Sequence, residues 1–200
     1  MRQLYLDCDG VLADFDAGAQ GVLGMKPRAF EQRHNLGRMW TRLASAPDFY
    51  ATLPMMPGAR DLFEAVRHLD PIILTGLPRG DWAAPQKVRW AAEHFPGTRI
   101  ITCMARDKRD HAKEGDVLVD DTLKHRHLWE EAGGIFVHHR SVDATLAELS
   151  TYFPLARRSM LHCTKNILQC GIASPICCSA ALGNDVLWLS VKQRRRPPRK

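Results

Sequence analysis

Two acidic residues, Asp7 and Asp9, follow an apolar run close to the N-terminus, in the stretch LYLDCDG. Side chains alternate along a strand, so a strand that reached this point would direct both carboxylates to the same side. Gly10 follows and permits a sharp turn of the backbone. Two neighbouring carboxylates repel each other unless a cation binds them or one of them keeps its proton. The spacing therefore predicts a metal-dependent site that contains Asp7 and Asp9.

A second acidic pair, Asp120 and Asp121, follows another apolar run, GDVLV. Open parallel sheets bind ligands at the carboxyl ends of their strands, so the two acidic pairs are expected to share one site. Carboxylate oxygens suit Mg²⁺. Alternation sends neighbouring side chains of a strand to opposite sides. Alternation alone therefore leaves open which of the two faces the site, and an aspartate at this place could also cap a helix that begins near Thr122.

Short apolar runs alternate with helical patterns along most of the chain, which predicts an α/β fold with a buried, doubly wound parallel sheet. The expected strands are Leu4–Leu6, Ile72–Leu74, Arg99–Thr102, Val117–Val119 and Ile135–His138. Helices are expected between them, and the last one is expected near Asp143–Phe153. This arrangement would bring the acidic pairs to one edge of the sheet.

Residues 14–56 form a connection that is too long for one crossover between neighbouring strands. The sequence predicts one or two helices here, Ala13–Leu23 and Pro27–Ala44, followed by an aromatic, proline-rich loop. An insertion at this place would cover the carboxyl ends of the strands as a small helical cap. Such caps exclude water and select substrates.

The stretch DCDGVLADF resembles the first motif of the haloacid dehalogenase (HAD) superfamily, in which Mg²⁺-dependent phosphatases form an aspartyl phosphate. ILTGLP (residues 73–78) resembles the second motif and GDVLVDD (residues 115–121) the fourth. The combination is most similar to the 5′(3′)-deoxyribonucleotidases, and the similarity covers roughly residues 1–153. It implies a HAD-like, Rossmann-like sheet with a small helical cap inserted after the first strand.

The resemblance also implies roles for the acidic residues in hydrolysis of a phosphomonoester. Asp7 would attack phosphorus, and Asp9 would protonate the departing oxygen and then activate water. The family pattern binds Mg²⁺ through the Asp7 carboxylate, the Asp9 backbone carbonyl and Asp121. Asp120 would then stand beside the ligands, and the reverse assignment of Asp120 and Asp121 stays open.

Phosphate binding is expected from Thr75 and the Gly76 amide, which end the second strand. Gly76 stands where these nucleotidases usually carry Ser, so one hydroxyl donor is missing. Lys108, in ARDK, matches the phosphate-binding lysine of the family, and Lys87 in QKVRW and Lys113 are alternatives.

Phe15 matches an aromatic residue that stacks on the nucleobase in the deoxyribonucleotidases. An aromatic ring offers a face to any base, although Phe15 and its neighbours Trp40, Phe49 and Tyr50 would equally serve as the core of the cap. The expected substrate is a (deoxy)nucleoside monophosphate. The alternative is a sugar phosphate or another small metabolite.

The formal net charge of +6 comes from one end of the 200-residue chain. Residues 155–200 hold nine of the 28 basic residues and one of the 22 acidic residues, which leaves a net charge of −2 for the rest. We therefore expect a phosphatase domain over residues 1–156 and a basic, cysteine-containing, disordered tail over residues 157–200. The alternative, a function that is not enzymatic, is binding of nucleic acid through this tail.

Cys8 and Cys103, outside the tail, both lie in apolar strand contexts, which favours a reducing, cytoplasmic environment. No secretory signal is visible. We expect neither a membrane nor nucleic acid as a partner, and a homodimer is left open.

Overall fold

The computed structural model describes residues 2–154. Five strands form one sheet in the order β3-β2-β1-β4-β5, and every pairing between neighbours is parallel. The strands are β1 (Leu4–Leu6), β2 (Ile72–Leu77), β3 (Ile100–Met104), β4 (Val117–Asp120) and β5 (Ile135–His138). The predicted α/β class with a parallel sheet is therefore confirmed. The predicted boundary at residue 156 and the tail over residues 157–200 lie outside the described residues.

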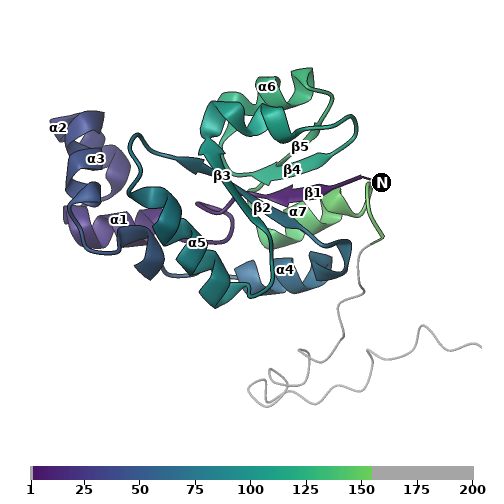
Figure 1. Ribbon diagram of the computed structural model, residues 1–200, viewed down its shortest axis with the longest axis horizontal. Coiled ribbons are helices and arrows are strands. Elements are labelled where there is room, and N and C mark those ends of the chain that lie inside the picture. Colours follow the sequence, from purple (N-terminus) through teal and green to yellow (C-terminus); the bar gives the residue numbers. More distant parts are fainter. Residues whose placement is uncertain (1, 155–200) are drawn as a thin grey trace, which may run out of the picture. The chain divides into compact units, whose positions relative to one another are not determined.

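Helices cover both faces of the sheet (Figure 1). One face carries α4 (Ala59–Val66), α5 (Ala83–His94) and α7 (Val142–Leu149). The other carries α6 (Arg126–Glu131) and the 3₁₀ helix η3 (Ala105–His111). The remaining 3₁₀ helices are η1 (Phe49–Thr52), η2 (Arg67–Leu69) and η4 (Leu123–His125). None of the described helices combines the length and the apolar character that crossing a membrane requires.

Neighbouring strand residues pack into two different hydrophobic clusters, as alternation requires. The larger cluster, on the side of α4, α5 and α7, includes Leu4, Leu6, Ile73, Val117 and Val119. The smaller cluster, on the side of α6 and η3, includes Tyr5, Ile72, Leu74, Leu118 and Phe136. Burial of each large apolar side chain contributes about 1.5–3 kcal/mol, so this two-sided pattern fixes the register of the central strands.

Three helices fill the long connection between β1 and α4: α1 (Phe15–Leu23), α2 (Pro27–His34) and α3 (Leu36–Ala44). They gather beyond the end of the sheet toward which β1 points (Figure 1). The sequence also allowed a single helix over Pro27–Ala44, but two helices are present. The break is at Asn35, whose φ of 100° is left-handed and whose side chain accepts a hydrogen bond from the Arg38 amide at 2.9 Å.

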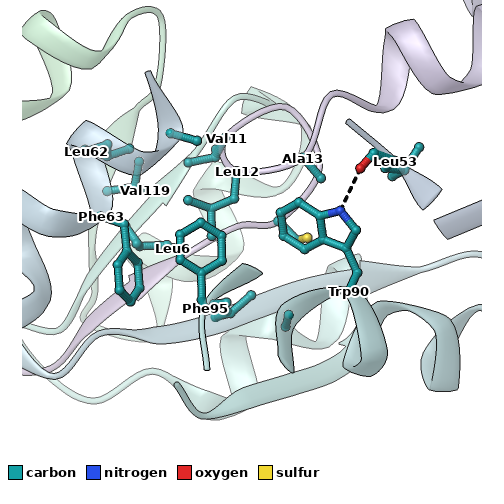
Figure 2. Close-up of a cluster of buried hydrophobic side chains, with 14 of the residues drawn as sticks. Leu6, Val11, Leu12, Ala13, Leu53, Leu62, Phe63, Trp90, Phe95 and Val119 are labelled. Carbon is teal, nitrogen blue, oxygen red and sulfur yellow. Dashed lines mark hydrogen bonds between the residues drawn. The ribbon is translucent and has the colours of Figure 1, made fainter. Parts of the chain in front are cut away.

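Trp90 fixes α5 against the end of this helical segment (Figure 2). Its indole Nε1 donates to the backbone carbonyl of Leu53 at 2.8 Å, and its ring is fully enclosed in the larger cluster. Ala83, Lys87, Trp90 and Ala91 form the buried face of α5, with the spacing of one helical stripe. The contacts of Trp90 therefore also determine where Lys87 points.

Candidate active site

Asp7 stands one residue beyond β1 and is still paired with the sheet. Its backbone N–H donates to the carbonyl of Val119 at 2.9 Å, so the ladder extends past Leu6. Asp7 is two residues after Tyr5, so its side chain lies on the same face of the sheet as that of Tyr5, which is the face that η3 covers. Its Oδ1 accepts from the Cys8 amide at 2.8 Å, and the side chain is largely buried.

Lys108 reaches Asp7 from η3, on the same face of the sheet. Its Nζ lies 2.9 Å from Oδ1 of Asp7 and 2.7 Å from Oδ2 of Asp120. Burial by itself lowers the pKa of Lys108, but the carboxylates of Asp7 and Asp120 outweigh burial and raise it above its ordinary value. Lys108 is therefore a fixed positive charge beside the predicted nucleophile.

Three carboxylates meet at this point: those of Asp7, Asp120 and Asp121, whose ligand oxygens lie within 4.8 Å of one another. Gly10 makes this approach possible, because its φ of 75° is left-handed and a Cβ on it would collide with the Asp121 carboxylate. When ionised, the three acids and Lys108 carry a formal net charge of −2. Oxygen ligands with this charge fit Mg²⁺.

Asp120 and Asp121 differ in their partners. Asp120 is held by Lys108 and accepts from the Thr122 amide at 2.8 Å, at the start of η4. Asp121 contacts the Thr122 hydroxyl at 3.4 Å and forms no ion pair among the described residues. Both carboxylates nevertheless lie beside Asp7, because β4 ends at Asp120 and strand alternation does not extend to Asp121.

The pKa of Asp121 is raised to about 7, first by partial burial of its carboxyl group and then by the negative charges of Asp7 and Asp120. The pKa of Asp120 is also raised, by burial and by Asp7, against the opposing charge of Lys108. A bound cation would reverse the contribution of the neighbouring acids. The protonation of Asp121 and the binding of a cation should therefore compete.

We expect Asp121→Asn to stabilise the metal-free protein at pH 8. Because the folded pKa of Asp121 exceeds its unfolded value of about 3.9, the stability that its neutral form provides is lost as the pH rises through about 7. The gain in melting temperature should be largest above pH 7, shrink toward pH 4, and disappear in Mg²⁺, which stabilises only the wild type. Thermal unfolding in EDTA and in Mg²⁺ measures this.

Asp70→Asn is a matched control, because Asp70 is exposed at the start of β2 and has a left-handed φ of 50° that Asn also adopts. It should show no gain that depends on pH. If the difference in melting temperature between Asp121→Asn and the wild type were the same from pH 4 to pH 8, this result would contradict the assignment of a raised pKa to Asp121.

Asp9 is held by a different lysine on the other face of the sheet. Lys87 Nζ, at the buried face of α5, donates to Oδ2 of Asp9 at 2.7 Å and to Oγ1 of Thr75 at 2.8 Å. The Tyr50 ring covers the same ammonium group at 4.4 Å. Asp9 lies beyond the end of β1, so alternation does not explain its direction, and the expectation that strand geometry aligns it with Asp7 is wrong.

The second oxygen of Asp9, Oδ1, is buried and has no hydrogen-bond partner among the described residues. Burial raises the pKa of Asp9, Lys87 opposes this effect, and the charge of Asp7 adds to it. An ammonium group can only donate, so a proton on Asp9 must reside on Oδ1 rather than on Oδ2. Asp9 therefore combines a raised pKa with one oxygen, Oδ1, that has no other partner among the described residues.

The two acidic groups open into one cavity of about 590 Å³, the active-site cavity. Its wall includes Asp7, Asp9 and Lys108, and on the side of the inserted helices it includes Phe15, Trp40 and Tyr50. The ring centroid of Phe15 lies 5.9 Å from that of Trp40 and 6.2 Å from that of Tyr50. The cavity therefore has a charged floor and an aromatic side.

The other residues that were predicted to bind phosphate differ in whether they line the active-site cavity. Gly76 lines the active-site cavity, whereas Thr75 is fully buried and lies outside its wall, bound to Lys87. A Cβ at Gly76 would lie 3.1 Å from the Cβ of Ala105, so a larger residue there would be crowded. Lys113 does not line the cavity.

Four arginine and lysine residues of the two cavities were not predicted as site residues: Arg79, Arg106, Lys124 and Arg109, the last of which lines only the active-site cavity. Arg106 and Lys124 line the active-site cavity, and Arg79 lines the cavity next to it. They belong to loops and 3₁₀ segments, and only Arg106 lies in a stretch that resembles a family motif, ARDK. Their position depends on the tertiary fold, and no pattern of neighbouring residues indicates it.

No protein-family model and no curated protein matches the sequence. Among solved structures, a haloacid dehalogenase-like hydrolase from Burkholderia xenovorans is similar at 17% identity and a TM-score of 0.46, over 78% of this chain and 91% of that one. The L-2-haloacid dehalogenase of Xanthobacter autotrophicus is similar at 14% identity and a TM-score of 0.46, over 76% and 84%. A HAD hydrolase of family IA from Entamoeba histolytica is similar at 16% identity and a TM-score of 0.41, over 76% and 89%.

Proposed function

We propose that this chain is a HAD-type, Mg²⁺-dependent phosphomonoesterase that acts through an aspartyl phosphate on Asp7. The observation that carries the proposal is the pairing of Asp7 with a buried Lys108 in the same cavity as Asp9, whose Oδ1 is free to hold a proton. The stretches DCDGVLADF, ILTGLP, ARDK and GDVLVDD, which follow one another in the order of the family motifs, support the same assignment.

In the first step, an Asp7 oxygen forms a bond to phosphorus while the bond from phosphorus to the ester oxygen breaks. Lys108 holds the reacting groups by its positive charge, and the proton on Oδ1 of Asp9 passes to the departing oxygen. Mg²⁺ bound by Asp7 and Asp121, with Asp120 beside them, would supply the charge that lets a carboxylate approach an anionic phosphate.

In the second step, Asp9 acts as a base, because it gave up its proton in the first. Its carboxylate takes a proton from a water molecule, whose oxygen forms a bond to phosphorus while the bond from phosphorus to Asp7 breaks. Inorganic phosphate leaves, and both carboxyl groups return to their starting states. Lys87 holds Asp9 in place through both steps.

The carboxyl group of Asp9 favours an oxygen leaving group over a halide. An alkoxide leaves with difficulty unless it is protonated, whereas a halide leaves without a proton. A carboxyl group with a raised pKa that lines the cavity suits the first reaction. We therefore favour a phosphatase over a dehalogenase on the same fold.

The favoured substrate class is a (deoxy)nucleoside monophosphate. The aromatic side of the cavity, formed by Phe15, Trp40 and Tyr50, offers ring faces on which a base could stack. The alternative is a sugar phosphate. We favour it less, because its hydroxyl groups would need polar partners, whereas this side of the cavity is aromatic.

Phosphate release from nucleoside monophosphates and sugar phosphates tests the function. We expect turnover in Mg²⁺, loss of turnover in EDTA, and recovery when Mg²⁺ is restored. Higher kcat/KM values for the nucleotides than for the sugars would support the nucleotidase assignment. Equal or higher values for sugar phosphates would replace that assignment, and an absence of turnover on every ester would contradict the phosphatase proposal.

A further inference from the structure

A second cavity of about 820 Å³, the distal groove, adjoins the active-site cavity. The two share seven lining residues, among them Trp40, Arg106 and Lys124, so they lie next to each other. The distal groove continues between α3 of the inserted helices and the loop that follows β2. A ligand whose reacting phosphate lies at Asp7 could therefore extend into it.

The distal groove has a strongly one-sided charge. Arg79, Arg106 and Lys124 line it together with His125, and none of the described residues that line it is an Asp or a Glu. The active-site cavity differs in this respect, since its floor is crowded with aspartates. Arg106, Lys124 and His125 also line the active-site cavity, whereas Arg79 lines the distal groove alone.

Two of these cations have no ion-pair partner in the part of the chain that the structure describes. Arg106 contacts the neighbouring Asp107 at 3.3 Å, whereas the eight ion pairs within residues 2–154 include neither Arg79 nor Lys124. The pKa of His125 is lowered, first by burial and then by Lys124 and other cations around it. The groove therefore holds two cations, Arg79 and Lys124, that form no ion pair with any described carboxylate.

Apolar side chains complete the groove and limit what can occupy it. Leu36 and Met104 line it and are 47% and 37% exposed, and Trp40 lines both the groove and the active-site cavity. An occupant should combine a compact anionic group with an organic body that contacts these side chains.

We propose that the distal groove binds a second phosphate group of the substrate, so that the enzyme prefers phosphomonoesters that carry two phosphates over those that carry one. The inference rests on the proposed phosphatase function, because it assigns the first phosphate to Asp7. Arginine suits phosphate through its planar fork of donors, and Lys124 adds a point charge. A second phosphate provides the negative charge that the groove lacks.

The test compares pairs of substrates that differ by one phosphate: thymidine 3′,5′-bisphosphate with thymidine 5′-monophosphate, and fructose 1,6-bisphosphate with fructose 6-phosphate. Within the pair that the enzyme hydrolyses faster, we expect kcat/KM to be about tenfold higher for the bisphosphate than for the monophosphate. The difference should come mainly from a lower KM, because charge-assisted hydrogen bonds add binding energy. The preference should decrease with added salt.

Arg79→Gln and Lys124→Gln should each remove most of this preference, read as the ratio of kcat/KM for the two members of a pair. Arg33→Gln is the matched control, because Arg33 is exposed on α2 and lines neither cavity. Ratios close to one in the wild type, or a preference that both groove variants retain, would overturn the inference and leave the phosphatase proposal intact.

A direct binding measurement separates failure of the groove from failure of the proposed function. If no ester is turned over, the phosphatase proposal fails, and calorimetry with thymidine 3′,5′-bisphosphate then tests the groove alone. Binding that is weakened about tenfold by Arg79→Gln, and unchanged by Arg33→Gln, would support an anion site there. Equal binding by all three proteins would overturn it. Tighter binding of a 5′-phosphorylated oligonucleotide than of the bisphosphate would instead point to a nucleic-acid end.

Discussion

Asp7→Asn should reduce kcat for every phosphate ester by roughly 10⁴- to 10⁶-fold, the range expected when a nucleophile is removed and only binding remains. A carboxamide cannot attack phosphorus, and its neutral oxygen pairs weakly with Lys108. The structural change is small, because Asn is nearly isosteric with Asp and Lys108 keeps its bond to Asp120 at 2.7 Å. Steady-state release of phosphate in Mg²⁺ measures the effect.

Two controls make this result specific to Asp7. Asp70→Asn, at the opposite end of the sheet, should turn over like the wild type. Asp7→Asn should also keep the fold, as judged by circular dichroism and by a cooperative thermal transition. A folded Asp7→Asn protein that retained more than about one tenth of the wild-type kcat would exclude Asp7 as the nucleophile.

Asp9→Asn should slow hydrolysis of alkyl phosphates by about 10²- to 10⁴-fold, the usual contribution of a general acid or base. The geometry gives the reason: Oδ2 of Asp9 accepts from Lys87, and Oδ1 is the oxygen that can carry the transferred proton. An Asn side chain can keep the bond to Lys87 but has no acidic proton. Rates with glycerol phosphate or a nucleotide measure the loss.

An aryl phosphate separates the two roles of Asp9. Nitrophenolate leaves without a proton, so Asp9→Asn should release it in a rapid stoichiometric burst, followed by slow turnover because water is no longer activated. Stopped-flow absorbance detects the burst. Equal slowing of the burst and of alkyl phosphate cleavage would show that Asp9 acts on the site as a whole and is not a proton donor.

The five strands and their approximate positions could be predicted from the sequence, because buried parallel strands are short apolar runs. β1 and β5 have the predicted bounds, whereas β2 continues through Gly76 to Leu77. The extension arises from pairing of Thr75, Gly76 and Leu77 with β3, which is a long-range contact that a local pattern does not contain.

The candidate site was predictable in its residue types but not in its pairings. From the sequence, Lys87 and Lys108 were alternatives for the lysine that binds the phosphate. In the structure they have different partners, since Lys87 binds Asp9 and Lys108 binds Asp7. The two faces of the sheet explain where the two lysines lie. Thr75 shares the face of Ile73 and α5, which carries Lys87, whereas Asp7 shares the face of Tyr5 and η3, which carries Lys108. Helix packing on the two faces decides this, and the sequence motifs do not encode it.

The stereochemical course at phosphorus tests the central claim most directly. A phosphorothioate monoester that is chiral at phosphorus through its oxygen isotopes would be hydrolysed in isotopically labelled water, and the configuration of the product determined. Two successive in-line displacements, first by Asp7 and then by water, predict net retention of configuration. Net inversion would mean that water attacks the ester directly, and it would contradict an aspartyl phosphate on Asp7.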